Sequence, residues 1–394
     1  MTTTRRDLMT AGAALSAFAL GGCLSTPRLT GVAARRSIRP GEIWLDTAGK
    51  PIQAHAGGII AVGKYFYWYG ENKEFTDGKQ GIESWGIRFY RSRDLYNWED
   101  LGPIIPPDTA DPSSPLSPKG FPERPHILFN PRTRKFVCWI KVRRGGEPQY
   151  RAVLTADAIT GPYTMVHRRL LPGGMAAGDF DIVIDPRDGK AFMYFEHDHE
   201  EVVCVELTAG WDDVTEKFTR HFVGSRPPAT PEGIACFQRE GKVFLTSSQM
   251  TGYFPNPSSV AVADRFHGPF TAIGDLHPTD PSRTSFNSQI SFIFKHPDKR
   301  DLYIALGDRW MPDVADRPNF ASGELSELVR SGIAKATAKP RKPMSPAERS
   351  AVGISAQIAN VNTSISRYVW LPIEFRDGRP TIAWRDEWTI DEYA

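Results

Sequence analysis

Short apolar runs separated by polar turns recur along the chain from about residue 50 onwards. Each unit has one apolar run, a polar turn, a second apolar run, and then a turn that often carries Asp and an aromatic residue. Apolar runs of this length, bounded by turn residues, are typical of buried β-strands. Five copies can be recognised, with their paired apolar runs at 65–69 and 87–90, 135–140 and 152–154, 191–195 and 202–205, 243–246 and 260–262, and 302–306 and 368–373.

The spacing of these copies predicts the fold class. The second and fourth copies end alike, as Asp157–Tyr163 and Asp264–Phe270, each with a Gly-Pro-aromatic sequence. Repeats of roughly 50 residues, each with several short strands, are typical of the blades of a β-propeller. We therefore predict an all-β protein, a five-bladed β-propeller over residues 46–394, with no independent second domain.

The fifth copy is interrupted at about 318–362 by a segment rich in Ala, Ser and Lys, with Pro340, Pro343 and Pro346. This composition predicts a surface insertion that is partly flexible and has one weak helix near 325–338. The basic run 335–342 is interpreted as a solvated loop face.

The first residues have the pattern of an export signal. Arg5-Arg6 precedes a short apolar run at 11–20, and Leu20-Gly21-Gly22-Cys23 resembles a lipobox. We expect an export signal peptide at 1–22, lipidation of Cys23, and a lipid-anchored tether at 23–45, hence a periplasmic or outer-membrane lipoprotein. The alternative is ordinary cleavage nearby, with Cys23 incidental.

Composition narrows the classes of partner. The 394 residues carry a net charge of +2, which argues against nucleic acid as the main partner. Cys138, Cys204 and Cys236 each lie inside an apolar run, so we expect buried free thiols. His197-Asp198-His199 resembles a metal cluster, but we place it as a solvated hairpin turn and expect no metal or other cofactor. We also expect a monomer.

Polar residues stand where the inner strands of the predicted blades begin. Glu232 follows a Pro-rich loop at 226–231 and leads directly into an apolar run. Inner strands of a propeller converge on its axis, so such residues meet although they are distant in sequence. Carboxylates accept hydrogen bonds from hydroxyls and aromatic faces stack on sugar rings, so the cluster predicts an oligo- or polysaccharide site. Its other members are His55, Glu71, Glu123, Asp179, Asp181, Gln289 and Asp308.

An ordered set of short strings resembles glycoside hydrolase family 43, most closely its exo-β-1,3-galactanase subfamily. The strings span about 50–388: Ala54-His55-Ala56-Gly57-Gly58-Ile59, Tyr67-Trp68-Tyr69-Gly70-Glu71, Glu123-Arg124-Pro125, Pro231-Glu232-Gly233, Thr251-Gly252-Tyr253, Phe286-Asn287-Ser288-Gln289, Gly307-Asp308-Arg309-Trp310 and Tyr368-Val369-Trp370-Leu371-Pro372. The resemblance implies a five-bladed propeller and an exo-acting hydrolase that releases terminal galactose from β-1,3-linked galactan with inversion. The alternatives are an arabinofuranosidase or xylosidase of the same family, or a non-catalytic glycan-binding propeller.

The resemblance also implies residue roles. Glu232 would be the general acid, and Glu123 would keep it protonated and oriented. The residues expected to bind the sugar are Glu71, Asp179, Thr251, Trp85, Trp310 and Trp370. Two structural alternatives stay open: a Glu123–Arg124 salt bridge, and Asp179 as a turn cap with Asp181 in the inward position.

The general base is the difficult point. Inverting glycosidases use a second carboxylate to activate water. Most of the family has an Asp near the start of the first blade, where this chain has His55. The subfamily resemblance implies that Gln289 handles the water, as an imidic tautomer or by positioning. The alternative is that Gln289 only binds sugar.

Overall fold

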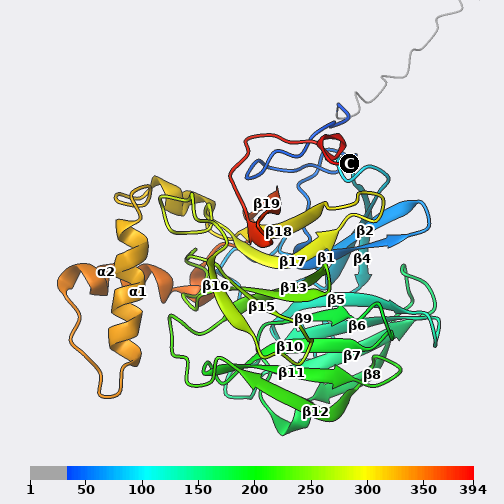
Figure 1. Ribbon diagram of the computed structural model, residues 1–394, viewed down its shortest axis with the longest axis horizontal. Coiled ribbons are helices and arrows are strands. Elements are labelled where there is room, and N and C mark those ends of the chain that lie inside the picture. Colours follow the sequence, from blue (N-terminus) through cyan, green and yellow to red (C-terminus); the bar gives the residue numbers. More distant parts are fainter. Residues whose placement is uncertain (1–32) are drawn as a thin grey trace, which may run out of the picture.

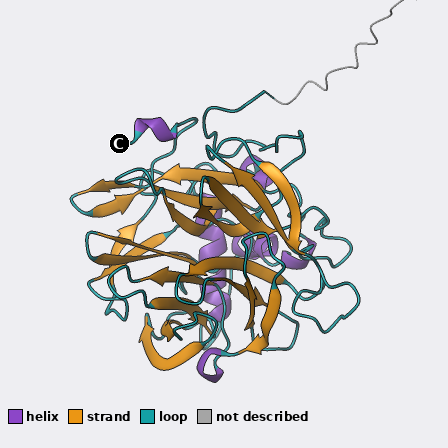
Figure 2. Ribbon diagram, turned by 90° about the vertical axis from the view of Figure 1, so that its right-hand side faces the viewer, coloured by secondary structure: helices purple, strands orange, loops and turns teal. Residues whose placement is uncertain are grey.

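The computed structural model describes residues 33–394, and the export signal and Cys23 lie outside the described residues. Its strands form five antiparallel sheets arranged as a five-bladed β-propeller, as predicted (Figure 1, Figure 2). Consecutive strands are neighbours in every blade. The blades are β1 His55–Val62, β2 Tyr65–Glu71, β3 Ile87–Ser92 and β4 Glu99–Ile105; β5 Pro122–Asn130, β6 Lys135–Val142, β7 Tyr150–Ala156 and β8 Thr164–Leu170; β9 Phe180–Ile184, β10 Ala191–His197, β11 Glu201–Leu207 and β12 Val214–His221; β13 Glu232–Arg239, β14 Lys242–Ser248, β15 Ser259–Ala263 and β16 Thr271–Asp275; and β17 Gln289–Lys295, β18 Tyr303–Arg309 and β19 Arg367–Pro372.

In each of the four four-stranded blades, the outermost strand is the least buried. In the second blade, β6 is buried along nearly its whole length, whereas the outermost strand β8 alternates between exposed and half-buried residues. A strand between two neighbouring blades must be apolar on both faces, which gives a continuous apolar run. Cys138, Cys204 and Cys236 lie on such strands, and each is a buried free thiol as expected.

The two ends of the described chain close the propeller together. Ile38 pairs with Trp388 through an isolated β-bridge, and Trp44 packs edge-on against Trp370 at 4.8 Å between ring centroids. Both Ile38 and Trp44 are buried. The expected tether at 23–45 therefore ends earlier than predicted, because residues from about 38 belong to the packed fold, beside the C-terminal segment (Figure 1).

The insertion contains two helices rather than one. α1 Glu324–Thr337 and α2 Pro346–Ser355 pack on each other around a small apolar core and protrude on one side of the propeller (Figure 1). Gly332 permits the close approach, since a Cβ there would lie 2.5 Å from Val352. The prediction of one weak helix missed α2, although Ser345 and Glu348 form a capping box with Pro346 at the first helical position.

Short elements complete the described chain. None of the helices within residues 33–394 is long and apolar enough to cross a membrane. The remaining elements are the hairpin β20 Glu374–Arg376 and β21 Arg379–Thr381, and the 3-10 turns η1 Pro172–Gly174, η2 Pro312–Asp316, η3 Ile358–Asn360 and η4 Ile390–Glu392.

Candidate active site

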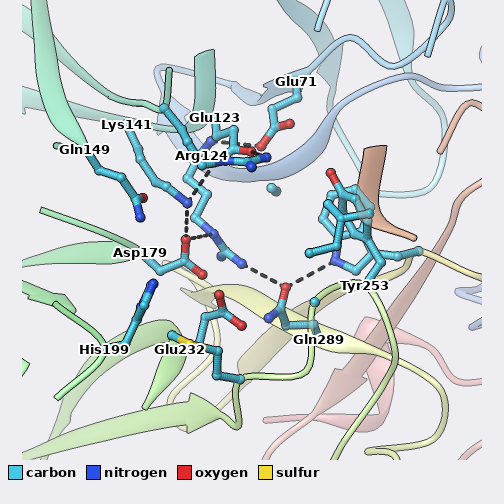
Figure 3. Close-up of a pocket in the computed structure, with 16 residues that line it drawn as sticks. Glu71, Glu123, Arg124, Lys141, Gln149, Asp179, His199, Glu232, Tyr253 and Gln289 are labelled. Carbon is cyan, nitrogen blue, oxygen red and sulfur yellow. Dashed lines mark hydrogen bonds and ion pairs between the residues drawn. The ribbon is translucent and has the colours of Figure 1, made fainter. Parts of the chain in front are cut away.

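A pocket of about 250 Å³ lies at the end of the axis where the innermost strands begin (Figure 3). All five blades and the insertion contribute to its wall. The lining residues are Ala56 and Glu71; Glu123, Arg124, Lys141, Arg143 and Gln149; Asp179 and His199; Glu232, Met250, Gly252 and Tyr253; Gln289 and Trp310; and Ile358.

Three of the five inner strands start with the same backbone irregularity. β1, β5 and β13 each have a β-bulge directly after the first residues, and the residues Ala56, Arg124 and Gly233 have positive φ angles of 47°, 49° and 55°. A bulge bends its strand and re-aims the neighbouring side chains. It thereby sets the direction of Glu123 and Glu232, the residues that precede Arg124 and Gly233.

A carboxylate of the preceding blade binds the backbone N–H of each bulge residue. Ala56 donates to Asp308 Oδ2, Arg124 to Glu71 Oε1, and Gly233 to Asp179 Oδ2, each at 2.9 Å. Adjacent blades are thus joined at the pocket by three equivalent hydrogen bonds. This places Glu71 and Asp179 in the pocket wall and gives both a scaffold role that the sequence did not predict.

The carboxyl group of Glu232 lies in the wall, and no other residue in 33–394 forms a hydrogen bond or ion pair with it (Figure 3). Burial raises the pKa of its carboxyl, and the nearby charge of Asp179 raises it further. Lys141 and Arg124 act in the opposite direction, but the pKa remains raised to about 8. Glu232 is therefore protonated at neutral pH, as a general acid requires.

Lys141 links two further carboxylates of the pocket, Glu123 and Asp179. Its Nζ lies 2.7 Å from Glu123 Oε2 and 2.7 Å from Asp179 Oδ1. Burial alone would raise the pKa of Glu123, but Lys141 and Arg143 outweigh it and lower that pKa to about 2. Asp179 also pairs with Arg124 Nε at 2.9 Å, and these two cations hold its pKa far below the usual range against the effect of burial. Both carboxylates are therefore charged.

These contacts exclude a Glu123–Arg124 salt bridge and a turn-capping role for Asp179, the two structural alternatives. Glu123 pairs with Lys141 and Arg143, not with Arg124. Asp179 is no turn cap: it faces the pocket, whereas Asp181 pairs with His126 and accepts the N–H of Cys236.

Gln289 lies beside Arg124 on the opposite side of the guanidinium from Asp179 (Figure 3). Its Oε1 accepts from Arg124 Nη2 at 2.8 Å and from Trp310 Nε1 at 3.1 Å, while its Nε2 donates to Ser248 Oγ at 2.9 Å. Both acceptor positions of the amide oxygen are occupied. The amide has one fixed orientation, and its oxygen can accept from a water only if one of these donors moves.

Three expected sugar-binding residues do not line the pocket. The prediction for Trp370 was wrong: the residue is 1% exposed and packs on Trp68 in the aromatic core, with 4.6 Å between the ring centroids. Thr251 is buried and bonds to Phe254 O and Asn256, so that it shapes the loop while the neighbouring Tyr253 enters the wall. Trp85 lies outside the pocket lining and packs against Phe75.

His55 also has a structural role. It is fully buried, pairs with Asp308 at 2.9 Å and stacks on Tyr368. Its neighbour Ala56 reaches the pocket instead.

Two lysines that pair with carboxylates of the pocket were missed, although the sequence contained signals for both. Lys141 interrupts the apolar run of β6 and pairs in register with Glu123. Lys73 is buried and binds Glu71 Oε2 at 2.7 Å. In the sequence it stands two residues after Glu71, which ends the Tyr-Trp-Tyr-Gly-Glu string. A lysine in a buried position indicates a paired carboxylate.

The expected solvated hairpin turn is confirmed, since Asp198 and His199 are both exposed, but His199 has a further position that was not predicted. It lies in the turn between β10 and β11, contacts Glu196 and lines the pocket. Within residues 33–394, no cluster of His, Cys, Asp and Glu is suited to hold a metal ion.

Similar structures share the fold over most of this chain. A family 43 β-1,3-galactosidase is 26% identical with a TM-score of 0.71, over 91% of this chain and 65% of that chain. An exo-β-1,3-galactanase from Phanerochaete chrysosporium, solved with galactose, is 26% identical with a TM-score of 0.69, over 90% of this chain and 68% of that one. An exo-β-1,3-galactanase from Clostridium thermocellum has a TM-score of 0.67 at 24% identity, over 89% and 66% of the two chains. This chain thus spans about two thirds of the length of these relatives.

The sequence profile described as glycosyl hydrolases family 43 matches residues 51–305, well over half of the chain. Among curated protein sequences, no significant match was found. The predicted family resemblance is confirmed by the profile and by the similar structures. The chain belongs to glycosyl hydrolase family 43.

Proposed function

We propose that the protein is an exo-acting glycoside hydrolase that removes terminal galactose from β-1,3-linked galactan with inversion. One observation carries the proposal: Glu232 has no cationic partner in a pocket where the neighbouring carboxylates Glu123 and Asp179 each have two. A protonated acid without a cationic partner, beside the two charged carboxylates Glu123 and Asp179, is the arrangement that general-acid cleavage of a glycosidic bond requires.

In this proposal Glu232 donates its proton to the departing glycosidic oxygen as the bond to the anomeric carbon breaks. The charge that develops on the sugar ring is positive, so the fixed negative charges of Asp179 and Glu123 stabilise the transition state. Asp179 also fixes the position of Glu232, since it binds the adjacent N–H of Gly233.

We propose that Gln289 orients the attacking water. The amide lies across the pocket from Lys141 and is held by three hydrogen bonds (Figure 3). Its oxygen becomes available to a water if substrate draws Arg124 or Trp310 away. The water attacks the anomeric carbon on the face opposite the leaving oxygen, which inverts the configuration. The proton that the water loses passes to solvent, and Glu232 takes up a proton from solvent before the next turnover.

Unpaired polar atoms in the wall are suited to sugar hydroxyls. Arg124 Nη1 and Gln149 Oε1 are buried without a partner in residues 33–394, one a donor and the other an acceptor. Buried polar groups are normally paired, so these two are candidates for contact with substrate. Glu71 and the ring of Trp310 complete the proposed sugar site, and Tyr253 packs against Trp310 at 5.4 Å.

The choice of galactose and of exo action depends on two further points. A small pocket at one end of the axis accepts the end of a chain rather than its middle. The similar structures with more than 25% identity are named as a β-1,3-galactosidase and exo-β-1,3-galactanases. Arabinofuranosidase or xylosidase activity is the nearest alternative. A non-catalytic glycan-binding propeller would need no isolated protonated acid.

We also propose that the protein is exported, lipidated at Cys23 and monomeric. The lipobox-like Leu20–Cys23 string supports the anchor. Replacing Cys23 with Ala should move the protein from the membrane fraction to the soluble periplasmic fraction. Unchanged membrane association would contradict lipidation.

The function is tested with a panel of β-1,3-galactan, arabinan and xylan oligosaccharides, with the first-formed anomer read by NMR. We expect release of galactose from β-1,3-galactan as the α-anomer. Release of another sugar, or of the β-anomer, would contradict the proposal in substrate or in stereochemistry.

A further inference from the structure

A second groove, of about 470 Å³, opens beside the candidate active site. It is lined by three segments: the turn 198–200, the loop at Arg226 and Pro227, and residues 336–341, which comprise the last residues of α1 and the segment that follows it. His199 lines both this groove and the pocket that contains Glu232. The groove is therefore adjacent to the pocket and shares one wall with it.

Hydrogen bonds fix the three segments relative to one another. Thr337 Oγ1 donates to Pro227 O at 2.7 Å, which attaches the end of α1 to the loop. Thr230 Oγ1 donates to His199 O at 2.6 Å, which attaches the same loop to the turn. The groove is thus built by the fold and includes part of the insertion.

Three exposed cations face this groove: Arg226, Lys339 and Arg341. None of them forms an ion pair or side-chain hydrogen bond with another residue in 33–394. Two carboxylates, Asp198 and Glu200, also line it, and Asp198 lies 3.5 Å from His197. The cations come from the loop and the insertion, so one wall of the groove offers several donors to an anion.

If Glu232 is the general acid, the groove lies on the side of the pocket where the leaving group departs. Glu232 must be next to the departing oxygen, and His199 lies beside Glu232 in the pocket wall (Figure 3). A substrate chain that leaves the pocket past Glu232 and His199 enters the groove.

We propose that this groove binds an anionic substituent, a uronic acid carboxylate or a sulfate ester, on the leaving-group portion of the polysaccharide. The inference rests on the proposed function. Arg226 and Arg341 present planar sets of N–H donors that suit carboxylate and sulfate oxygens, and Lys339 adds a point charge. The enzyme would then prefer acidic galactan over neutral galactan.

The test compares matched ligands. Binding to the Glu232→Gln protein is measured for a β-1,3-galactan oligosaccharide with a glucuronic acid branch, for its carboxyl-reduced counterpart, and for a sulfated oligosaccharide. We expect at least about fivefold tighter binding of one or both anionic ligands at low salt, with the preference lost at ~0.5 M salt. The ligand that binds more tightly than the neutral one, carboxylate or sulfate, identifies which anionic substituent the groove recognises.

A triple variant with Arg226→Gln, Lys339→Gln and Arg341→Gln should lose the preference and keep its affinity for the neutral ligand. The matched control removes three exposed cations, Lys64, Arg132 and Arg265, from turns that follow β1, β5 and β15. Those turns lie at the strand ends away from the pocket, so the control should keep the preference.

Equal binding of neutral and anionic ligands would overturn the inference and leave the proposed function intact. Failure to bind or cleave the neutral oligosaccharide would overturn both. Binding of phosphatidylglycerol vesicles that the triple variant loses, without any preference among the oligosaccharides, would assign these cations to a membrane surface and also overturn the inference.

Discussion

The Asp179 carboxylate accepts the backbone N–H of Gly233 at 2.9 Å, one residue after the proposed acid Glu232. The same carboxylate is charged and raises the pKa of Glu232, after the larger effect of burial. Asp179 therefore acts on Glu232 in two ways, through the position of the strand and through its charge. The two effects can be separated by experiment.

Replacing Asp179 with Asn keeps an oxygen that can accept from Gly233 but removes the charge. The pKa of Glu232 should then fall, because Lys141 and Arg124 remain nearby. Activity requires protonated Glu232 and is lost as the pH rises through its pKa, so the basic limb of kcat/KM should move from about pH 8 to lower pH. Asp188→Asn, in an exposed turn of the same blade, is the control and should leave the limb in place. An unchanged limb in Asp179→Asn would contradict the electrostatic role.

Lys141→Met tests the buried charge network. The substitution keeps the apolar stem of the side chain but leaves Glu123 and Asp179 without their shared cation. Removing one partner of a buried ion pair costs about 3–5 kcal/mol of the free energy of unfolding. Lys135→Met, on the same strand with an exposed ion pair to Asp157, should cost at most about 1 kcal/mol. The measurement is urea-induced unfolding, and equal losses in the two variants would contradict the network.

Gly252 couples the pocket to the insertion. Its φ is 62°, and a Cβ there would lie 3.0 Å from the backbone oxygen of Ser355 and from the side chain of Ile358. Gly252→Ala should lower the free energy of unfolding by about 1–2 kcal/mol and raise KM, because Tyr253 and Ile358 line the pocket. In Gly353→Ala the new Cβ meets nothing within 4 Å on an exposed face of α2, and a gain of about 0.5–1 kcal/mol is expected. Thermal unfolding measures the stability of the two variants, and initial rates give their KM. An unchanged KM for Gly252→Ala would show that the insertion does not shape the site.

Gln289→Ala distinguishes handling of water from binding of sugar. If the amide orients the water, kcat should fall by about 10²-fold or more, the usual scale for loss of such catalysis. If it only binds sugar, KM should rise while kcat changes little. Ser248→Ala removes only the hydrogen-bond partner of the Gln289 amide nitrogen and leaves the amide oxygen in place. It should therefore reduce kcat by less than about tenfold.

The blades could be predicted because each buried strand is a continuous apolar run between turn residues. Lys135–Ile140 and Val243–Thr246 show this pattern, and both lie within strands of the structure. The start of the packed fold was harder to predict, since the burial of Ile38 and Trp44 depends on contacts with the distant C-terminal part of the chain. Helix α2 was missed because its apolar face is short, although its capping box was visible.

Glu123, Asp179 and Glu232 could be predicted because they stand at or directly before the start of inner strands, which must meet at the axis. The same reasoning failed for Trp370, which lies on β19, the third strand of its blade, and packs against Trp68 instead of facing the pocket. The sequence around Trp370 does not indicate this direction. The pairing of Glu123 with Lys141 depends on strand register, which the bulge at 123–126 shifts. Sequence spacing alone does not show such a shift.

The central claim is that Glu232 is the general acid, and Glu232→Gln with two leaving groups tests it most directly. The kcat/KM for β-1,3-galactobiose, whose leaving oxygen needs a proton, should fall by about 10²–10⁴-fold. The kcat/KM for 2,4-dinitrophenyl β-galactoside, whose leaving group needs none, should change by less than about tenfold on the same reasoning. A similar fall for both substrates, or no fall for galactobiose, would contradict the claim.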